Sequence, residues 1–286
     1  MKHVPIHWFF FLLTGLVLSC SKDEENLSPD KYTIKKDIAY GAHPQQKIDL
    51  YLPAGRSQEA TRTLILIHGG GWTSGDKWEM DVFIDTSLMR KGNYAIVNMN
   101  YRLANETQFK HPYQMEDIRK VILFLRDHAA DYHIHPGRFA LAGASAGGHL
   151  ALLYDYGYDQ EDYVKAVISC AGPTNFAVPE ILQDTSQYLS VYGYLGKTHW
   201  ENLDLWYEAS PYHRAGSNSA PTAIFMGEAD HIVPLAQGQM MKARLDSLGV
   251  PVMYTQYAGA GHGWWPGGPY FPDTQYKILH WLEEYL

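Results

Sequence analysis

Short apolar runs alternate with longer amphipathic stretches along most of this chain. Runs such as TLILIHG (63–69) and RFALAGA (138–144) are almost entirely apolar, which is typical of parallel strands covered by helices on both faces of a sheet. The strands expected from this pattern are residues 32–40, 47–53, 63–69, 94–103, 138–144, 164–172, 221–230 and 250–259. The expected helices are residues 79–91, 112–132, 146–155, 235–248 and 272–286.

The order of these elements predicts an α/β fold with a mostly parallel eight-stranded sheet and helices on both faces. From the third strand onward, strands and helices alternate, as they do in a doubly wound sheet. No helix separates the first two strands, so we expect an antiparallel hairpin at one edge. Residues 173–220 interrupt the alternation with an aromatic-rich, irregular stretch. A long connection inside a compact domain is usually functional, and we interpret this one as a substrate-side insertion in a single domain, 33–286.

The first twenty residues differ from the rest of the chain. A weakly basic start precedes the apolar run WFFFLLTGLVLS and then Cys20; the run is too short to span a bilayer comfortably and is typical of a signal-peptide core. VLSC resembles the lipobox of bacterial lipoproteins, and CSKDEE resembles a surface-export signal of lipoproteins in the Bacteroidota. These resemblances imply a signal peptide (1–19), a lipid anchor on Cys20 and a polar tether (20–32). The protein is then exported and anchored to a bacterial membrane, expected to be the outer one, with the cell surface as its expected location.

The charge and the cysteine count exclude several classes of function. A net charge of −8 without a Lys/Arg stripe argues against nucleic acid as a partner, because nucleic-acid binding needs clustered cations. Cys170 is the one cysteine after Cys20 and lies in an apolar run, so we expect a core residue and no internal disulfide. His133 and His135 lack a third ligand in pattern, and we interpret them as surface or capping residues. We expect neither a metal nor a cofactor.

The clearest candidate for chemistry is the motif Gly143-Ala144-Ser145-Ala146-Gly147, between an apolar strand and an apolar helix. A serine at the apex of such a turn is strained and exposed above the sheet, and glycines two residues to either side let the turn close. The following helix begins at the serine, where its positive dipole favours developing negative charge. The motif therefore predicts a nucleophilic serine, which needs a base and a group that orients the base.

Position along the chain selects these partners. His262 follows the last expected strand and Asp230 ends the strand before it, so both are expected at the C-terminal edge of the sheet, where catalytic groups collect in open α/β folds. Glu228 is an alternative acid one step deeper in the same strand. His231 is expected to point away from Asp230, and His149 is expected to pack or to form local hydrogen bonds.

The segment HGGGWTSGDKW (68–78) follows another apolar strand and is a candidate anion-binding loop. It does not fit a Walker loop, because Asp76 occupies the lysine position. It does not fit a dinucleotide motif, because Ser74 replaces the last glycine. The remaining interpretation is an oxyanion hole, in which glycine N–H groups face a carbonyl oxygen as it becomes anionic.

With HGGGW, GASAGG, GEAD and GAGHG in this order, the chain resembles the α/β-hydrolase superfamily. It is most similar to the carboxylesterase branch with an H-G-G-G motif, which includes the hormone-sensitive-lipase-like esterases. HGGGWTSGDK, YRL and ASAGGHLA resemble a bacterial subgroup of feruloyl and acetylxylan esterases. The resemblance implies an α/β-hydrolase fold over about residues 35–286.

The same resemblance implies a role for each motif residue. The catalytic triad would be Ser145 as the nucleophile, His262 as the general acid and base, and Asp230 as its orienter. The oxyanion donors would be the N–H groups of Gly70, Gly71 and Ala146, and His68 would brace their loop.

The function expected from these residues is a serine hydrolase that cleaves carboxylic esters through an acyl-enzyme. Its substrate would be a small ester or an acylated carbohydrate, such as an acetylated or feruloylated plant polysaccharide. A serine peptidase of the prolyl-oligopeptidase type and a non-catalytic glycan-binding lipoprotein stay as alternatives. Several aromatic side chains are candidates for stacking on sugar or aryl rings, with hydrophobic packing as the alternative: Trp72, Tyr188, Tyr192, Tyr194, Trp200, Trp206, Trp264 and Trp265.

Overall fold

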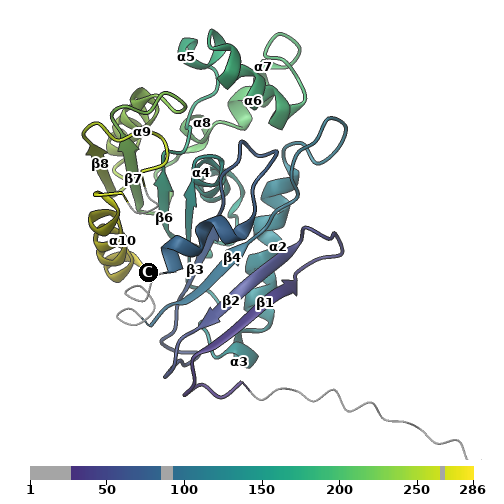
Figure 1. Cartoon of the computed structure of the whole chain (residues 1–286), viewed down its shortest axis with the longest axis vertical. Coiled ribbons are helices and arrows are strands. Elements are labelled where there is room, and N and C mark those ends of the chain that lie inside the picture. Colours follow the sequence, from purple (N-terminus) through teal and green to yellow (C-terminus); the bar gives the residue numbers. More distant parts are fainter. Residues whose placement is uncertain (1–26, 85–92, 265–267) are drawn as a thin grey trace, which may run out of the picture.

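The computed structural model describes residues 27–84, 93–264 and 268–286 (Figure 1). The predicted signal peptide, Cys20 and Trp265 lie outside the described residues. Within the described ranges, no helix has the length and apolar character needed to cross a bilayer.

In the described part of the chain, eight strands form one sheet in the order β1-β2-β4-β3-β5-β6-β7-β8 (Figure 1). The strands are β1 (Thr33–Ala39), β2 (Lys47–Leu52), β3 (Thr63–Ile67), β4 (Ala95–Met99), β5 (Phe139–Ala144), β6 (Val164–Cys170), β7 (Thr222–Gly227) and β8 (Val252–Tyr257). β2 is antiparallel to both β1 and β4, and every other neighbouring pair is parallel. The mostly parallel sheet and its edge hairpin are therefore confirmed.

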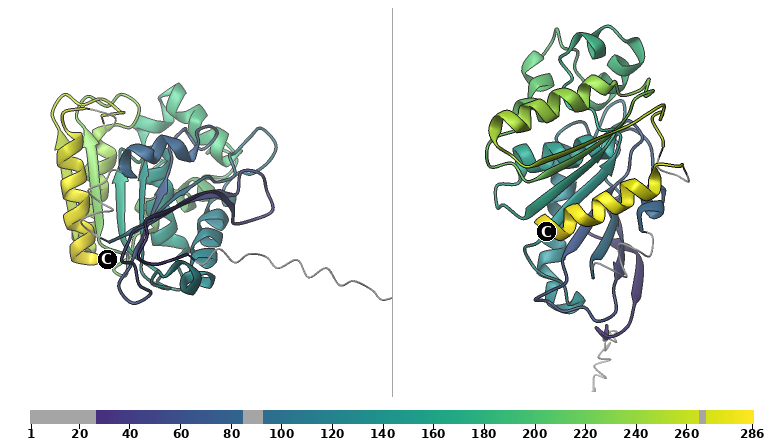
Figure 2. Two further views of the ribbon diagram at one scale, coloured as in Figure 1. Left: turned by 60° about the horizontal axis from the view of Figure 1, so that its bottom comes forward. Right: turned by 90° about the vertical axis from the view of Figure 1, so that its left-hand side faces the viewer.

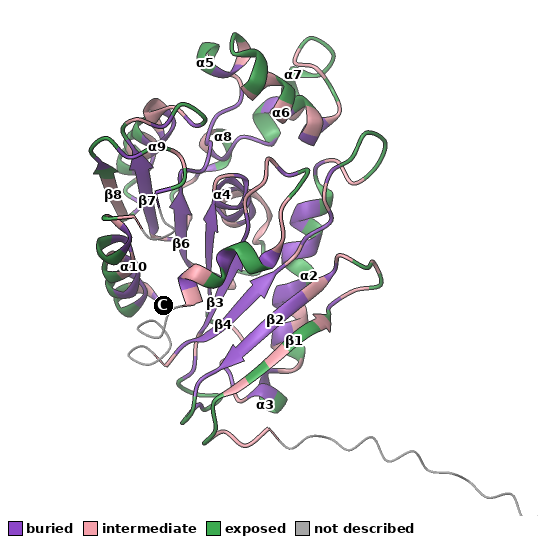
Figure 3. Ribbon diagram, in the orientation of Figure 1, coloured by how far each residue is buried: buried purple, intermediate pink, exposed green. Residues whose placement is uncertain are grey.

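Helices cover both faces of this sheet. One face carries α2 (Tyr113–Asp127), α3 (Ala129–Tyr132), α4 (Ala146–Tyr158) and α9 (Leu235–Leu248), and the other carries η1 (Lys77–Ile84) and α10 (Phe271–Tyr285) (Figures 1 and 2). Alternate residues of β3 serve the two layers, because Ile65 and Ile67 pack with α2 and α4 whereas Leu64 and Leu66 pack with η1 and α10. The inner strands are consequently buried, while β1 and β8 at the edges are partly exposed (Figure 3).

Two predicted helices differ in detail from the structure. Residues 77–84 form a 3₁₀ helix rather than the start of an α-helix over 79–91, and residues 85–92 lie outside the described part. The expected helix 112–132 is divided into α2 and α3 at His128.

The insertion (173–220) contains four short helices and lies at the carboxyl ends of the strands, away from β1 and β2 (Figures 1 and 2). They are α5 (Pro179–Leu182), α6 (Thr185–Leu195), α7 (Leu203–Glu208) and α8 (Pro211–Arg214). Buried side chains of the insertion, including Tyr194 and Trp206, share one hydrophobic cluster with α2 and α4. The insertion is therefore part of the same domain.

The last residues of the predicted tether lie against this domain. The buried guanidinium of Arg56 donates hydrogen bonds to the carbonyl oxygens of Leu27 and Lys31, at 3.1 and 2.7 Å, and Leu27 packs on the core. The last residues of the predicted tether (20–32) thus contact the domain at Leu27 and Lys31.

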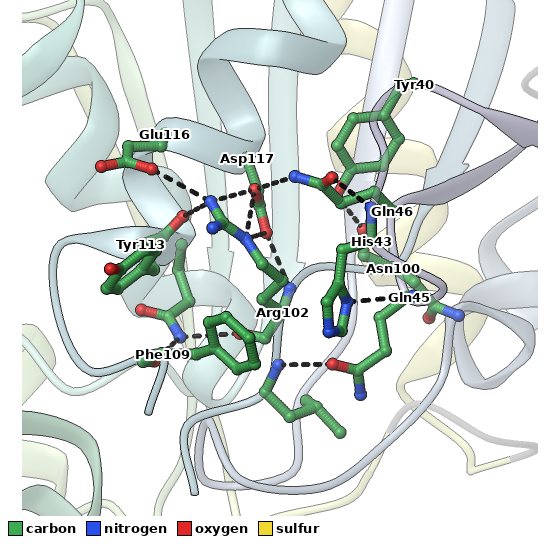
Figure 4. A network of polar contacts seen from close by, with 12 residues as sticks. Tyr40, His43, Gln45, Gln46, Asn100, Arg102, Phe109, Tyr113, Glu116 and Asp117 are labelled. Atoms are coloured by element: carbon green, nitrogen blue, oxygen red, sulfur yellow. Dashed lines mark hydrogen bonds and ion pairs between the residues drawn. The ribbon is translucent and has the colours of Figure 1, made fainter. Parts of the chain in front are cut away.

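The arginine of the YRL segment, which follows β4, forms a buried ion pair (Figure 4). Arg102 donates from its backbone N–H and its guanidinium to Asp117 of α2, at 2.7–3.0 Å. Gln46 donates to the same carboxylate at 2.7 Å. These contacts tie the end of β4 to α2 and to the β1–β2 hairpin.

Candidate active site

Ser145 lies at the apex of a strained turn between β5 and α4. Its backbone has φ of 53° and ψ of −120°, a region that non-glycine residues rarely adopt. A Cβ added to Gly143 would lie 2.2 Å from the carbonyl of Gly147, and one added to Gly147 would lie 2.0 Å from the carbonyl oxygen of Ile67. Both glycines are thus required by close backbone approach, as the motif predicts.

Hydrogen bonds join this serine to the two residues predicted as its partners. His262 Nε2 lies 2.9 Å from Ser145 Oγ, and His262 Nδ1 lies 2.8 Å from Asp230 Oδ2. Because a carboxylate accepts, Nδ1 carries the proton and Nε2 is left to accept from the serine hydroxyl. The geometry is that of a nucleophile, a general base and an orienting acid.

The Asp230 carboxylate is held in place by burial and by backbone hydrogen bonds. Its side chain is fully buried, and its Oδ1 accepts from the backbone N–H groups of Ile232 and Val233, each at 2.8 Å. Glu228, the alternative acid, is exposed and accepts from the Gln256 amide instead. The structure therefore brings Asp230, and not Glu228, to His262.

Three further histidines occupy the places expected of packing or capping groups, whereas His231 is exposed and borders the cavity. His133 ends α3 in the left-handed conformation, and His135 accepts from the Gly137 N–H. In the portion of the chain that the structure describes, no group of three or more His, Cys, Asp or Glu side chains has the arrangement of a metal site. His149 is buried, as expected of a packing residue, but its hydrogen bonds are not local: its partners are Trp72 and the Ala209 carbonyl, which are distant in the sequence.

The glycine loop after β3 borders the same cavity as Ser145. Gly70 and Gly71 have φ of +99° and +57°, and a Cβ on Gly70 would lie 2.1 Å from the carbonyl oxygen of Ser74. Ala146 opens α4, where the first N–H groups have no partner within the helix. The three predicted oxyanion donors thus lie at one cavity with the serine.

His68, which was expected to brace this loop, is its first residue and contacts the loop backbone. Its ring is buried and stacks on Tyr101 with centroids 4.3 Å apart. Its Nδ1 bonds the Gly69 carbonyl at 2.8 Å, and the Tyr101 hydroxyl donates to the His68 and Gly69 carbonyls. Burial lowers the pKa of His68 to about 4, so the ring stays neutral near pH 7.

The cavity above Ser145 measures about 450 Å³, within the range of small-molecule sites. Met80 of η1, and Ile181 and Val191 of the insertion, supply apolar walls. The lining also includes polar side chains that sequence reasoning missed, namely Glu79, Asp184, Ser186, Gln187 and Ser190. For the four that lie in the insertion, its length was the one sign in the sequence, and Glu79 of η1 had none.

Four of the predicted aromatic stacking residues are packed inside the protein, whereas Tyr192 and Trp200 of the insertion are 41% and 86% exposed. Trp264, a predicted substrate contact, is 6% exposed, packs on Tyr257 and is absent from the described cavity lining. Trp72 borders the cavity, but at 3% exposure its ring is part of a packed wall. Tyr194 and Trp206 are fully buried. Hydrophobic packing, the alternative given for such residues, applies to all four.

Comparison with known proteins places this arrangement in a family. A sequence model of the BD-FAE family matches residues 48–245. The esterase LipC of Mycobacterium tuberculosis is 24% identical over 248 residues, which cover 82% of this chain and 60% of LipC. The kynurenine formamidase of Debaryomyces hansenii is 34% identical over 124 residues, 42% of this chain and 39% of that enzyme. The chain therefore spans less than two thirds of the length of these curated relatives.

Solved structures show the same fold. A truncated carbohydrate esterase from gut microbiota superposes with a TM-score of 0.75 at 24% identity, covering 89% of this chain and 98% of that one. A bifunctional GH43-CE protein of Bacteroides eggerthii superposes with a TM-score of 0.75 at 23% identity, covering 88% of this chain and 35% of that one. The fold is that of the α/β-hydrolases, and the chain belongs to the BD-FAE family.

Proposed function

We propose that the protein is a serine hydrolase that cleaves carboxylic esters. One observation carries the proposal: a buried carboxylate, a histidine and a strained serine form a continuous hydrogen-bonded chain at the floor of a cavity. The esterase names of several relatives support it.

The proposed reaction begins with Ser145 Oγ attacking the ester carbonyl carbon while its proton passes to His262 Nε2. The carbonyl oxygen becomes an oxyanion held by the N–H groups of Gly70, Gly71 and Ala146. The C–O bond to the alcohol then breaks, and the alcohol takes the proton from His262. Water, deprotonated by the same nitrogen, attacks the acyl carbon of the acyl-enzyme. The bond from that carbon to Ser145 Oγ then breaks, Oγ takes the proton back from His262, and the acid is released.

The proposed substrates are acylated carbohydrates, with acetyl and feruloyl esters of plant polysaccharide as the first to test. Two structural relatives are named as carbohydrate esterases, and the polar side chains that the insertion adds to the cavity suit a hydroxyl-rich alcohol. An exported, lipid-anchored location, proposed from the N-terminal sequence, would bring the enzyme to polymers. Labelled palmitate incorporated by the wild type but not by Cys20→Ala would support the anchor.

The decisive experiment compares wild type with Ser145→Ala on 4-nitrophenyl acetate. Hydrolysis should vanish in the variant and survive in Ser247→Ala, a serine of α9 outside the cavity lining. A fluorophosphonate should label wild type and not Ser145→Ala, which distinguishes an enzyme from a glycan-binding protein that has kept the fold. Faster turnover of a dipeptide nitroanilide than of the ester would instead favour the peptidase alternative. Acetylated xylan and methyl ferulate then define the acyl group.

A further inference from the structure

His149 connects three parts of the molecule that meet at the proposed oxyanion loop. It lies one helical turn after Ser145 on α4 and is fully buried. The indole N–H of Trp72, in the glycine loop, donates to His149 Nδ1 at 3.1 Å. On the opposite side of the ring, Nε2 lies 2.8 Å from the carbonyl oxygen of Ala209, at the end of α7 in the insertion.

These two contacts fix the protonation state of the ring. An indole N–H only donates, so Nδ1 must be the acceptor; a carbonyl only accepts, so Nε2 must carry the proton. A second proton would place N–H against N–H at Trp72 and break the contact. Burial lowers the pKa of His149 to about 3, which keeps the ring neutral in the form that the two partners require.

Trp72 needs such a restraint because its backbone is strained. Its φ is +63°, and a non-glycine residue persists in this region only where its surroundings impose it. The backbone carbonyl accepts from Ala104 at 2.9 Å, and the ring stacks on Tyr194 at 4.8 Å and meets Phe176 edge-on. The bond to His149 is the contact that ties the indole directly to the helix that carries Ser145.

The strain lies next to the groups that the reaction needs. Trp72 follows Gly71, whose N–H is one of the proposed oxyanion donors, and both residues border the cavity. Any relaxation of Trp72 toward negative φ would rotate the preceding peptide groups relative to Ser145. Donors of this kind act only when they are aimed at the position of the oxyanion.

We propose that His149 is a positioning residue, which holds the oxyanion loop in its strained conformation through Trp72 and couples that loop to the insertion through Ala209. The proposal rests on the proposed function. His149 touches neither the cavity nor the reacting atoms, so its effect should fall on the rate of the chemical step and not on substrate binding. A residue that merely fills the core would instead lower stability alone.

Three variants and a matched control test this. His149→Met keeps the bulk and removes both hydrogen bonds, whereas His149→Gln keeps one acceptor and one donor. Trp72→Phe keeps a ring in the aromatic cluster and removes the indole N–H. The control is Tyr194→Phe, which keeps its ring against Trp72 and removes a buried hydroxyl that bonds to His111 and not to the loop.

The measurements are kcat and KM for 4-nitrophenyl acetate, the rate of fluorophosphonate labelling, and the midpoint of thermal unfolding. We expect kcat and the labelling rate to fall about tenfold in His149→Met and in Trp72→Phe, as loss of one positioning hydrogen bond predicts, with KM within about twofold of wild type. His149→Gln should recover most of the rate. A double variant that combines His149→Met with Trp72→Phe should lose little kcat beyond either single variant, because both substitutions remove the same hydrogen bond. Tyr194→Phe should unfold earlier and keep its kcat.

The outcomes separate the inference from the proposed function. An unchanged kcat in His149→Met and Trp72→Phe, with lowered unfolding temperatures, would overturn the positioning role while leaving the esterase intact. If His149→Met does not fold, Trp72→Phe decides alone, since it keeps a ring in place. A tenfold loss in Tyr194→Phe as well would also overturn the inference, because any damage to the cluster would then suffice. A wild type that neither hydrolyses esters nor reacts with the fluorophosphonate refutes the proposed function and the inference with it.

Discussion

Asp117→Asn should lower the stability of the fold more than any other exchange of one polar atom in the network of Figure 4. The carboxylate of Asp117 is fully buried, and the Arg102 side chain beside it is 9% exposed. Four donors converge on it, namely the backbone N–H, Nε and Nη2 of Arg102 and the amide of Gln46. The asparagine keeps the shape of the side chain, but it leaves the buried guanidinium with the half-exposed Glu116 as its remaining counter-charge and turns an NH₂ group toward other donors.

The expected magnitude follows from this burial. Removal of one partner from a buried ion pair costs about 3–5 kcal/mol, because the remaining charge stays desolvated. At roughly 2–4 °C per kcal/mol for a domain near this size, the unfolding midpoint should fall on the order of 6–20 °C.

Glu116→Gln is the matched control for this prediction. Glu116 bonds the same Arg102 guanidinium at 3.0 Å, but its side chain is 51% exposed, so its loss should cost less than about 1 kcal/mol. Thermal unfolding of both variants, followed by far-UV circular dichroism in one buffer, measures the difference. A midpoint shift for Asp117→Asn no larger than that for Glu116→Gln would refute the reasoning that burial sets the value of this pair.

The remaining predictions concern the site, the turn, acid stability and substrate charge. Asp230→Asn should keep the fold and lower kcat about 10⁴-fold, because the amide no longer holds the histidine in the required tautomer; steady-state kinetics and an unchanged circular dichroism spectrum check this. Gly147→Ala should express poorly or unfold well below wild type, since its Cβ would lie 2.0 Å from a carbonyl oxygen, whereas Gly137→Ala, with its nearest neighbour at 3.9 Å, should not. Burial lowers the pKa of His111 to about 4. As the pH falls from about 6.5 to 4, this histidine is therefore protonated in the unfolded chain and stays neutral in the native protein. Stability should decrease over that interval, and less steeply in His111→Gln, in unfolding midpoints measured across it. The described residues that line the cavity include Glu79 and Asp184 and no lysine or arginine, so an ester with a carboxylate-terminated acyl chain should be cleaved about two- to fivefold more slowly than a neutral ester of equal length at low salt. Equal kcat/KM values for the two esters would contradict this.

The sheet was predictable because its inner strands are buried on both faces. Such strands are apolar throughout, and the expected runs at 63–69 and 138–144 contain β3 and β5 as observed. The run expected at 94–103 extends four residues past β4. The sequence gives no sign that the strand ends before Tyr101 and Arg102, because the hydrogen bonds of Arg102 to Asp117 of α2 are tertiary contacts. The 3₁₀ form of η1 was not predictable, since one short stretch of apolar spacing fits either kind of helix.

The chemical residues were predictable for a different reason. Ser145, Asp230 and His262 follow the ends of β5, β7 and β8 in motifs that contain glycine, so their order and local motifs place them at one edge before any contact is known. The cavity wall that α5 and α6 form has no such motif. The residues of this wall border the cavity because the insertion packs on α2 and α4. That packing is a tertiary contact, which the local sequence pattern does not indicate.

Backbone strain at residues other than glycine cannot be predicted from the local sequence. A glycine in a turn indicates a positive φ, as it does at Gly70 and Gly71, but Trp72 and Ser145 also adopt positive φ, of 63° and 53°. Each such residue costs on the order of 1–3 kcal/mol, and a glycine at either position would remove that cost. Strain alone does not identify a functional residue, since Phe109 and Ala171 also have φ of 55° and 50°. At Ser145 the strained position carries the hydroxyl held by His262. At Trp72 it carries the indole N–H bound to His149, so the strain and this hydrogen bond to α4 together assign Trp72 to the active-site architecture.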